Sequence, residues 1–206
     1  MNSSDLFLNL NFSESQMQAI VKIYEKYFEP HMPKRYDGRG VIALWYPGAT
    51  WETGKGDDRN HNHIGIISDE CRDDVLWQEF IDLLPHMSPS ATITKMPAGN
   101  VMRPHVDRKW RPEAIYFPIR GCTDDCISEY YDLPKENTQN SQGINHFPEA
   151  SHTFAVKDRA VLTNVHEWHG VKNNSKVERI AIGWNMKLEY SFDDCKTILK
   201  ELGYTE

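Results

Sequence analysis

The chain of 206 residues lacks the features that mark membrane, secreted and nucleic-acid-binding proteins. It has no run of about 18 or more apolar residues, as a transmembrane helix would need. Its N-terminal stretch has neither the basic nor the long apolar region of a secretory signal. Lysine and arginine are dispersed in a chain of net charge −7, whereas nucleic-acid binders carry a basic stripe. We therefore expect a cytoplasmic protein that binds neither membrane nor nucleic acid.

Cysteine pairs, internal repeats and low-complexity linkers are also missing. The four cysteines form no C-x-x-C pair, so we expect reduced thiols, mostly buried. With 39% apolar and 26% charged residues, the composition is that of a globular protein. We predict one domain over residues 1–206, in which 1–90 flank a barrel core at 91–190 and 191–206 form a C-terminal helix.

Three segments have helical periodicity. Residues 13–29 begin with Ser13 as N-cap and Gln16 three residues later, which is a capping box. Residues 72–84 carry acids in the first turn and stop before Pro85. Residues 192–202 follow Ser191 as a cap and precede Gly203 as a stop signal.

Short β-prone runs separated by turn residues fill the chain between the last two helices. Their density predicts a closed or sandwiched antiparallel sheet, here a double-stranded β-helix (jelly-roll barrel), with helices over one outer face. The expected strands are 91–96, 101–107, 114–119, 126–131, 152–156, 159–164 and 177–187, with 41–46 and 64–68 as additions.

His105 and Asp107 alternate on one expected strand. Residues two apart on a strand point to the same face, so the two side chains would project together as ligands of one metal. Two histidines and one carboxylate form the facial set that binds iron(II) and leaves positions open. The downstream candidates for the second histidine are His146, His152, His166 and His169.

The segment from His169 to Arg179 favours His169. Asn173–Ser175 are turn residues, and a hairpin centred on Asn174 would place His169 opposite Arg179, with both side chains in one pocket. His166 lies three residues away and would face the other side of a regular strand. His166 remains the alternative ligand.

The strand after Arg179 has two unlike faces. One face is bulky and apolar, and consists of Ile180, Ile182, Trp184 and Met186. The other is small or polar, and consists of Arg179, Ala181, Gly183 and Asn185. A barrel interior that holds a ligand needs such small residues. A guanidinium there suits the distal carboxylate of 2-oxoglutarate, which it binds bidentately.

His105-x-Asp107, the distant His169 and Arg179 ten residues later resemble the iron(II)/2-oxoglutarate oxygenases. HGVKNNSKVERI, from His169, is similar to the aspartyl/asparaginyl β-hydroxylases, and MPAGNVMRPHVD, ending at Asp107, is similar to prolyl hydroxylases. The resemblance covers roughly residues 91–187. It implies iron(II), 2-oxoglutarate and O₂ as cofactor and co-substrates, with ascorbate as a further candidate.

Four other features are candidates for contacts at the site. Tyr116 is a candidate for cofactor contact, and Trp110 and Arg120 for substrate contact; the alternatives are packing for Tyr116 and a surface ion pair for Arg120. The polar stretch Leu133–Phe147 is a candidate lid.

Three functions stay open from the sequence. The first is hydroxylation of a prolyl or Asp/Asn side chain in a peptide, and the second is hydroxylation of a free amino acid or other small molecule. The third is a cupin-like metal-binding or sugar-recognition module without oxidation chemistry, which would have no need of Arg179. The sequence does not indicate an oligomeric state.

Overall fold

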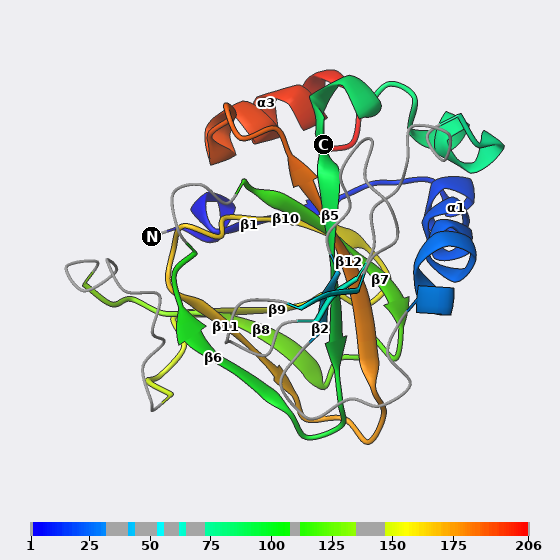
Figure 1. Cartoon of the computed structure of the whole chain (residues 1–206). Coiled ribbons are helices and arrows are strands. Elements are labelled where there is room, and N and C mark those ends of the chain that lie inside the picture. The colour runs from blue at the N-terminus through cyan, green and yellow to red at the C-terminus, as the bar shows by residue number, and fades with distance from the viewer. Residues whose placement is uncertain are drawn as a thin grey trace.

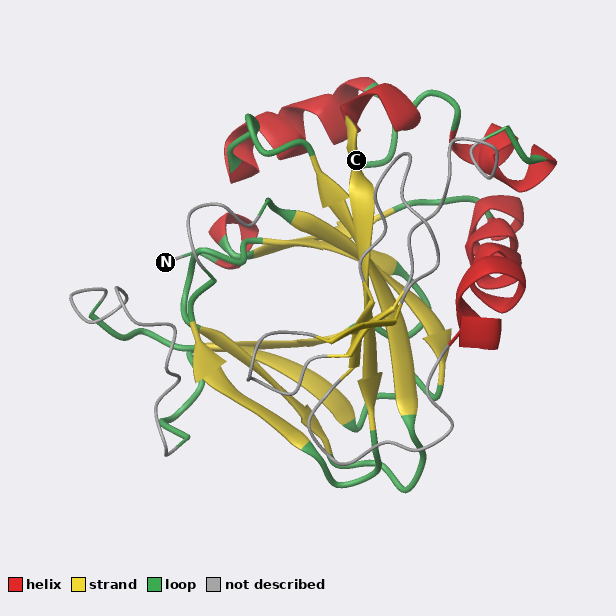
Figure 2. Cartoon of the chain, in the orientation of Figure 1, coloured by secondary structure: helices red, strands yellow, loops and turns green. Residues whose placement is uncertain are grey.

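Two facing antiparallel sheets form the body of the protein, and helices cover one of them (Figures 1 and 2). One sheet has six strands in the order β1-β10-β7-β12-β5-β2, and the other has four in the order β6-β11-β8-β9. The chain crosses between the sheets repeatedly from β5 to β12, which is the jelly-roll pattern. The predicted fold class is therefore confirmed. The computed structural model describes residues 2–31, 41–43, 53–55, 62–64, 73–107, 112–134 and 147–205.

Most expected strands form, with ends shifted by a few residues. Phe7–Leu10 was not predicted as a strand, yet it pairs along β10 at the edge of the larger sheet. The short strands Thr53–Lys55 and Asn62–Ile64 pair with each other and form a third, two-stranded sheet. The strands are β1 (Phe7–Leu10), β2 (Val41–Ala43), β3 (Thr53–Lys55), β4 (Asn62–Ile64), β5 (Met87–Met96), β6 (Val101–His105), β7 (Ala114–Arg120), β8 (Cys126–Tyr130), β9 (His152–Ala155), β10 (Ala160–Thr163), β11 (His169–Asn173) and β12 (Arg179–Met186).

The first and last helices begin as predicted. Ser13 and Gln16 form the capping box of α1, and Ser191 forms one with Asp194 at α3. The first helix changes type after Ile23, continuing as a π-helix and then a 3₁₀ turn that contains Pro30. No helix in the described residues is long and apolar enough to span a membrane. The helical elements are η1 (Ser3–Asp5), α1 (Glu14–Ile23), η2 (Tyr24–Phe28), η3 (Glu29–His31), η4 (Val75–Phe80), η5 (Leu84–His86) and α3 (Phe192–Glu201).

The α-helix predicted for residues 72–84 is wrong. The structure has two 3₁₀ helices there, and Pro85 lies inside the second one. Trp77, Phe80 and Leu83 recur every three residues and are at most 1% exposed. A 3₁₀ helix has three residues per turn, so η4 places Trp77 and Phe80 on one buried face, and the turn after η4 adds Leu83 to the same cluster.

The main apolar core lies between the six-stranded sheet and the helices. Trp184 of β12 packs against Trp77 and Phe80 of η4, with ring centroids 5.0 and 5.6 Å apart. Leu199 of α3 and Ile20 of α1 belong to the same buried cluster. The bulky face of β12 therefore points out of the barrel, as its alternation predicted.

The three cysteines within the described residues, Cys122, Cys126 and Cys195, are free thiols, which agrees with the prediction of reduced cysteines. Cys126 and Cys195 are buried, and Cys122 is partly buried. Cys71 lies outside the described residues.

Candidate metal centre

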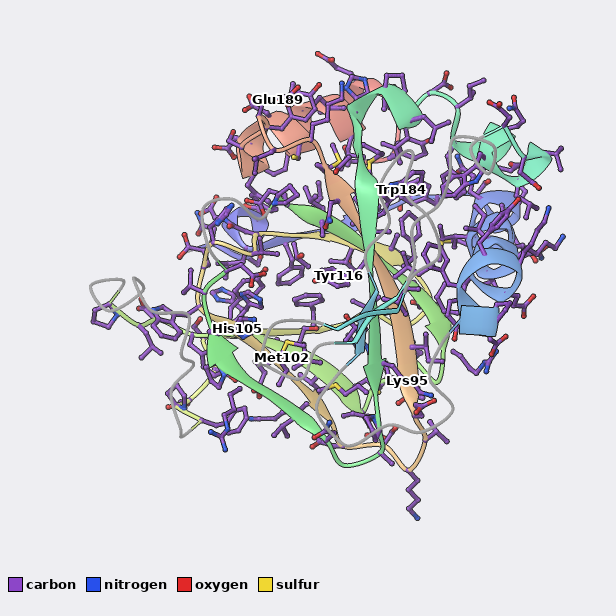
Figure 3. All side chains as sticks on the ribbon, in the orientation of Figure 1. Lys95, Met102, His105, Tyr116, Trp184 and Glu189 are labelled. Carbon is purple, nitrogen blue, oxygen red and sulfur yellow. The ribbon has the colours of Figure 1, made fainter. Side chains whose placement is uncertain are left out.

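Pairing of β6 with β11 places His105 directly opposite His169. The two imidazole centroids are 4.3 Å apart. Asp107 follows just after β6, with Oδ1 3.8 Å from His105 Nε2 and Oδ2 4.0 Å from His169 Nε2. One ligand atom from each of the three residues lies within 4.8 Å of the others. Figure 3 shows His105 on β6 beside the space between the sheets.

Both histidines are held in the tautomer that a metal requires. Nδ1 of His105 is 2.8 Å from the Arg103 carbonyl, and Nδ1 of His169 is 2.8 Å from the Glu167 carbonyl. A carbonyl only accepts, so each Nδ1 donates, and Nε2 is the ring nitrogen that can coordinate a metal. With a carboxylate beside them, these donors fit a divalent metal of the iron(II) type.

His166, the alternative ligand, lies apart from this cluster. Its Nε2 is 3.7 Å from Oε1 of Glu113, a buried residue just before β7. The structure thus brings His169 together with His105 and Asp107, as predicted, and not His166.

The hairpin used to choose His169 is wrong. β11 pairs with β6 and β8, whereas β12 pairs with β5 and β7, so His169 and Arg179 lie in different sheets. Asn173 explains the crossover, because its side-chain amide donates to the carbonyls of Met96, Pro97 and Val177. The buried Asn173 therefore ties the β11–β12 turn to the end of β5. In a hairpin, β11 and β12 would instead pair directly with each other.

Arg179 begins β12 and is only 2% exposed. Its buried Nε has no hydrogen-bond partner among the described residues. Alternation places it on the same face as Gly183, where an added Cβ would come within 2.8 Å of the Tyr116 ring. Tyr116 lies between the two sheets (Figure 3), so this face of β12 lines the barrel interior. A buried cation with a free donor calls for an anion.

The weaker candidates have different placements. Tyr116 lies inside the barrel opposite Gly183. Arg120 donates to Glu29 at 2.8 Å and is half-exposed, which is the surface ion pair given as its alternative, so the structure does not support a substrate contact. Trp110 lies outside the described residues, as does most of the candidate lid, 135–146.

Two residues near the cluster were missed from sequence. The Tyr130 ring is 6.2 Å from that of His169, and its hydroxyl donates to the Leu6 carbonyl. Glu113 contacts the turn before His169. Neither residue belongs to a local motif, and their placement depends on strand pairing between distant segments.

No family model and no curated protein matches the sequence. Among solved structures, the chain is similar to the non-heme α-ketoglutarate-dependent epimerase SnoN from nogalamycin biosynthesis. The TM-score is 0.50 with 9% identity, over 92% of this chain and 84% of SnoN. The chain has the fold of SnoN. Because identity is so low, the likeness concerns the fold alone.

Two further structures match at lower similarity. A Pseudomonas putida prolyl-4-hydroxylase gives a TM-score of 0.45 and 16% identity, over 90% of this chain and 94% of that one. AviO1 from Streptomyces viridochromogenes Tue57 gives 0.40 and 11%, over 88% and 89%.

Proposed function

We propose that this protein is an iron(II)- and 2-oxoglutarate-dependent oxygenase whose metal is held by His105, Asp107 and His169. Two imidazole Nε2 atoms and one carboxylate converge on a single point. This donor set occupies one side of a metal and leaves the other side open to ligands. SnoN, which shares the fold, is itself α-ketoglutarate-dependent, and α-ketoglutarate is 2-oxoglutarate.

The observation that carries the proposal is the buried guanidinium of Arg179 in the barrel that also holds the ligand cluster. β11 runs from His169 to Asn173, and after the following turn the chain enters β12 at Arg179. A short dicarboxylate bound to the metal would extend from the cluster toward Arg179. The guanidinium would bind its far carboxylate through two parallel hydrogen bonds.

Bound iron(II) would supply the oxygen activation that oxidises 2-oxoglutarate and substrate. The protein residues contribute orientation and exclusion of water. The carbonyls of Arg103 and Glu167 fix the imidazole rings, and Arg179 fixes the co-substrate. Gly183, on the same face of β12 as Arg179, leaves room for the Tyr116 ring, which lies against it inside the barrel.

We propose a prolyl or Asp/Asn side chain of a peptide as the hydroxylated group, on the resemblance of residues 91–187 to hydroxylases of such side chains. A free amino acid or other small molecule is the second candidate, because SnoN is an epimerase of nogalamycin biosynthesis. A cupin-like module without oxidation chemistry would leave the buried charge of Arg179 without a ligand.

The test is oxygen-dependent conversion of 2-oxoglutarate to succinate with iron(II) and ascorbate, over a panel of peptides and amino acids. We expect turnover by the wild type, stimulation by one substrate class, and loss of turnover in His169→Ala. His152→Ala is the matched control, because His152 lies on β9 outside the ligand cluster, and it should stay active. If the iron-loaded wild type converts no 2-oxoglutarate with any substrate, the oxygenase proposal is wrong.

A further inference from the structure

The turn between β10 and β11, residues 164–168, contacts two of the three proposed metal ligands through its backbone. The N–H of Asp107 donates to the Val165 carbonyl at 3.0 Å. Nδ1 of His169 donates to the Glu167 carbonyl at 2.8 Å. A shift of this turn would therefore move a carboxylate and an imidazole ligand together.

Glu113 holds this turn from its position just before β7, the strand beside β10 in the six-stranded sheet. Its Oε2 accepts the Val165 N–H at 2.9 Å, and both residues are at most 2% exposed. The backbone carbonyl of Glu113 accepts the N–H of Met186 at 2.8 Å, which ties Glu113 to the end of β12. Val165 is thus fixed through its N–H by Glu113 and through its carbonyl by Asp107.

We infer that Glu113 is a positioning residue for the metal centre, which acts by holding Val165 in the place where its carbonyl orients Asp107. The inference rests on the proposed function, because it takes His105, Asp107 and His169 to be metal ligands. Partners that orient a ligand in this way commonly contribute 10–100-fold to metal affinity.

Packing alone does not explain a carboxyl at this position. Burial raises the pKa of Glu113 to about 7, and the negative charge of Asp107 adds to the increase. An apolar side chain would fill the same space without the desolvation cost of a carboxylate. Two contacts offset part of the free-energy cost of burying this carboxyl. Oε2 accepts the Val165 N–H, and Oε1 lies 3.7 Å from His166 Nε2 in the same turn.

Titration with Co(II) tests the inference, since cobalt binds the same donor types as iron(II) and its absorption spectrum reports the ligand geometry. Glu113→Gln keeps an oxygen acceptor at the same reach without the charge. Glu113→Asp keeps the charge but withdraws the acceptor by one methylene, and Glu113→Ala removes it. Thr163→Val is the control, because Thr163 is buried nearby and its hydroxyl donates to Ala114 rather than to the turn.

We expect Co(II) affinity to fall roughly 10–100-fold in Glu113→Asp and Glu113→Ala, with an altered cobalt spectrum. Glu113→Gln should stay within about threefold of the wild type, since amide and carboxylate oxygens both accept a hydrogen bond. Thr163→Val should bind as the wild type does. Circular dichroism shows whether each variant folds. If either Glu113→Asp or Glu113→Ala fails to fold, the other variant alone tests the inference.

The inference is overturned if the Gln variant binds no more tightly than the Asp and Ala variants. It is also overturned if these variants lower only the melting temperature, leaving affinity and spectrum unchanged, because that is the result of a packing role alone. Failure of the wild type itself to bind Co(II) is a separate outcome, which would reject the metal centre and with it the proposed function.

Discussion

The two faces of β12 differ although every residue of the strand is buried. On the outer face, Trp184 and its neighbours pack against η4 and the other helices. On the inner face, Arg179 presents a buried charge, and Gly183 leaves space that Tyr116 approaches. The main apolar core thus lies outside the barrel, and the inner face of β12 carries the buried Arg179 beside the Tyr116 ring. It follows that stability and ligand binding can be perturbed separately on one strand.

The largest effect on stability is expected from the outer face. Trp184→Ala removes a fully buried ring that contacts Trp77 and Phe80, so unfolding should become easier by about 3–5 kcal/mol. Denaturant unfolding measures this change. The folded fraction should bind metal with wild-type affinity. If folded Trp184→Ala binds metal more weakly, the two faces of β12 do not act separately.

Substitution of a metal ligand should have the opposite effect, with a large loss of metal affinity and a small change in stability. His169→Ala removes one of three donors, so metal affinity should fall by more than about 100-fold, beyond the loss typical of outer partners. The metal-free variant should unfold within about 1 kcal/mol of the wild type, because the side chain is partly exposed and lies outside the apolar core. Metal titration and denaturation of the metal-free protein check the two halves. Equal metal affinity in His169→Ala would reject the ligand set.

Glu113 makes stability depend on pH. Its pKa is raised to about 7 from an ordinary 4.5, so between these values the folded state holds a proton that the unfolded state releases. The stabilisation is therefore complete below pH ~4.5 and is lost as pH rises through ~7, by at most about 3 kcal/mol.

Chemical denaturation at pH 5 and pH 8 in the presence of a chelator measures the Glu113 effect. Glu113→Gln cannot titrate, so its loss of stability between the two pH values should be smaller than that of the wild type. Parallel pH profiles for the two proteins would contradict the shifted pKa.

Arg120 provides the smallest expected effect. It lies at the end of β7 and pairs with Glu29 on the surface, so Arg120→Ala should cost less than about 1 kcal/mol of stability. Affinity for 2-oxoglutarate should not change. Calorimetry on the metal-loaded protein measures this affinity. A weaker affinity in Arg120→Ala would mean that Arg120 contacts the co-substrate, as Arg179 is proposed to do.

Local patterns in the sequence predicted much of this arrangement. Ser13 and Ser191 were recognisable as caps because capping depends on residues three apart. The two faces of β12 followed from a period of two. The closeness of His105 and Asp107 was predictable because His105 ends β6 and Asp107 follows two residues later.

Long-range contacts could not be predicted in the same way. The hairpin was wrong because β11 and β12 belong to different sheets, and Asn173 ties the turn between them to Met96 at the end of β5, 77 residues earlier in the chain. Glu113 was missed because its partner, Val165, comes 52 residues later. The α-helix expected over 72–84 was wrong because the segment forms two 3₁₀ helices instead, and the first places Trp77 and Phe80, three residues apart, on one buried face.

Anaerobic titration of 2-oxoglutarate into the iron(II)-loaded protein tests the central claim most directly, with the wild type compared with Arg179→Ala and Arg179→Lys. All three proteins should fold and bind metal. Loss of the guanidinium should weaken 2-oxoglutarate binding by about 2–5 kcal/mol, as when one partner of a buried charged pair is removed. Lysine should restore only part of the affinity, because it lacks the planar fork. Equal affinities in the wild type and Arg179→Ala would contradict the co-substrate assignment and leave a metal-binding barrel without oxygenase chemistry.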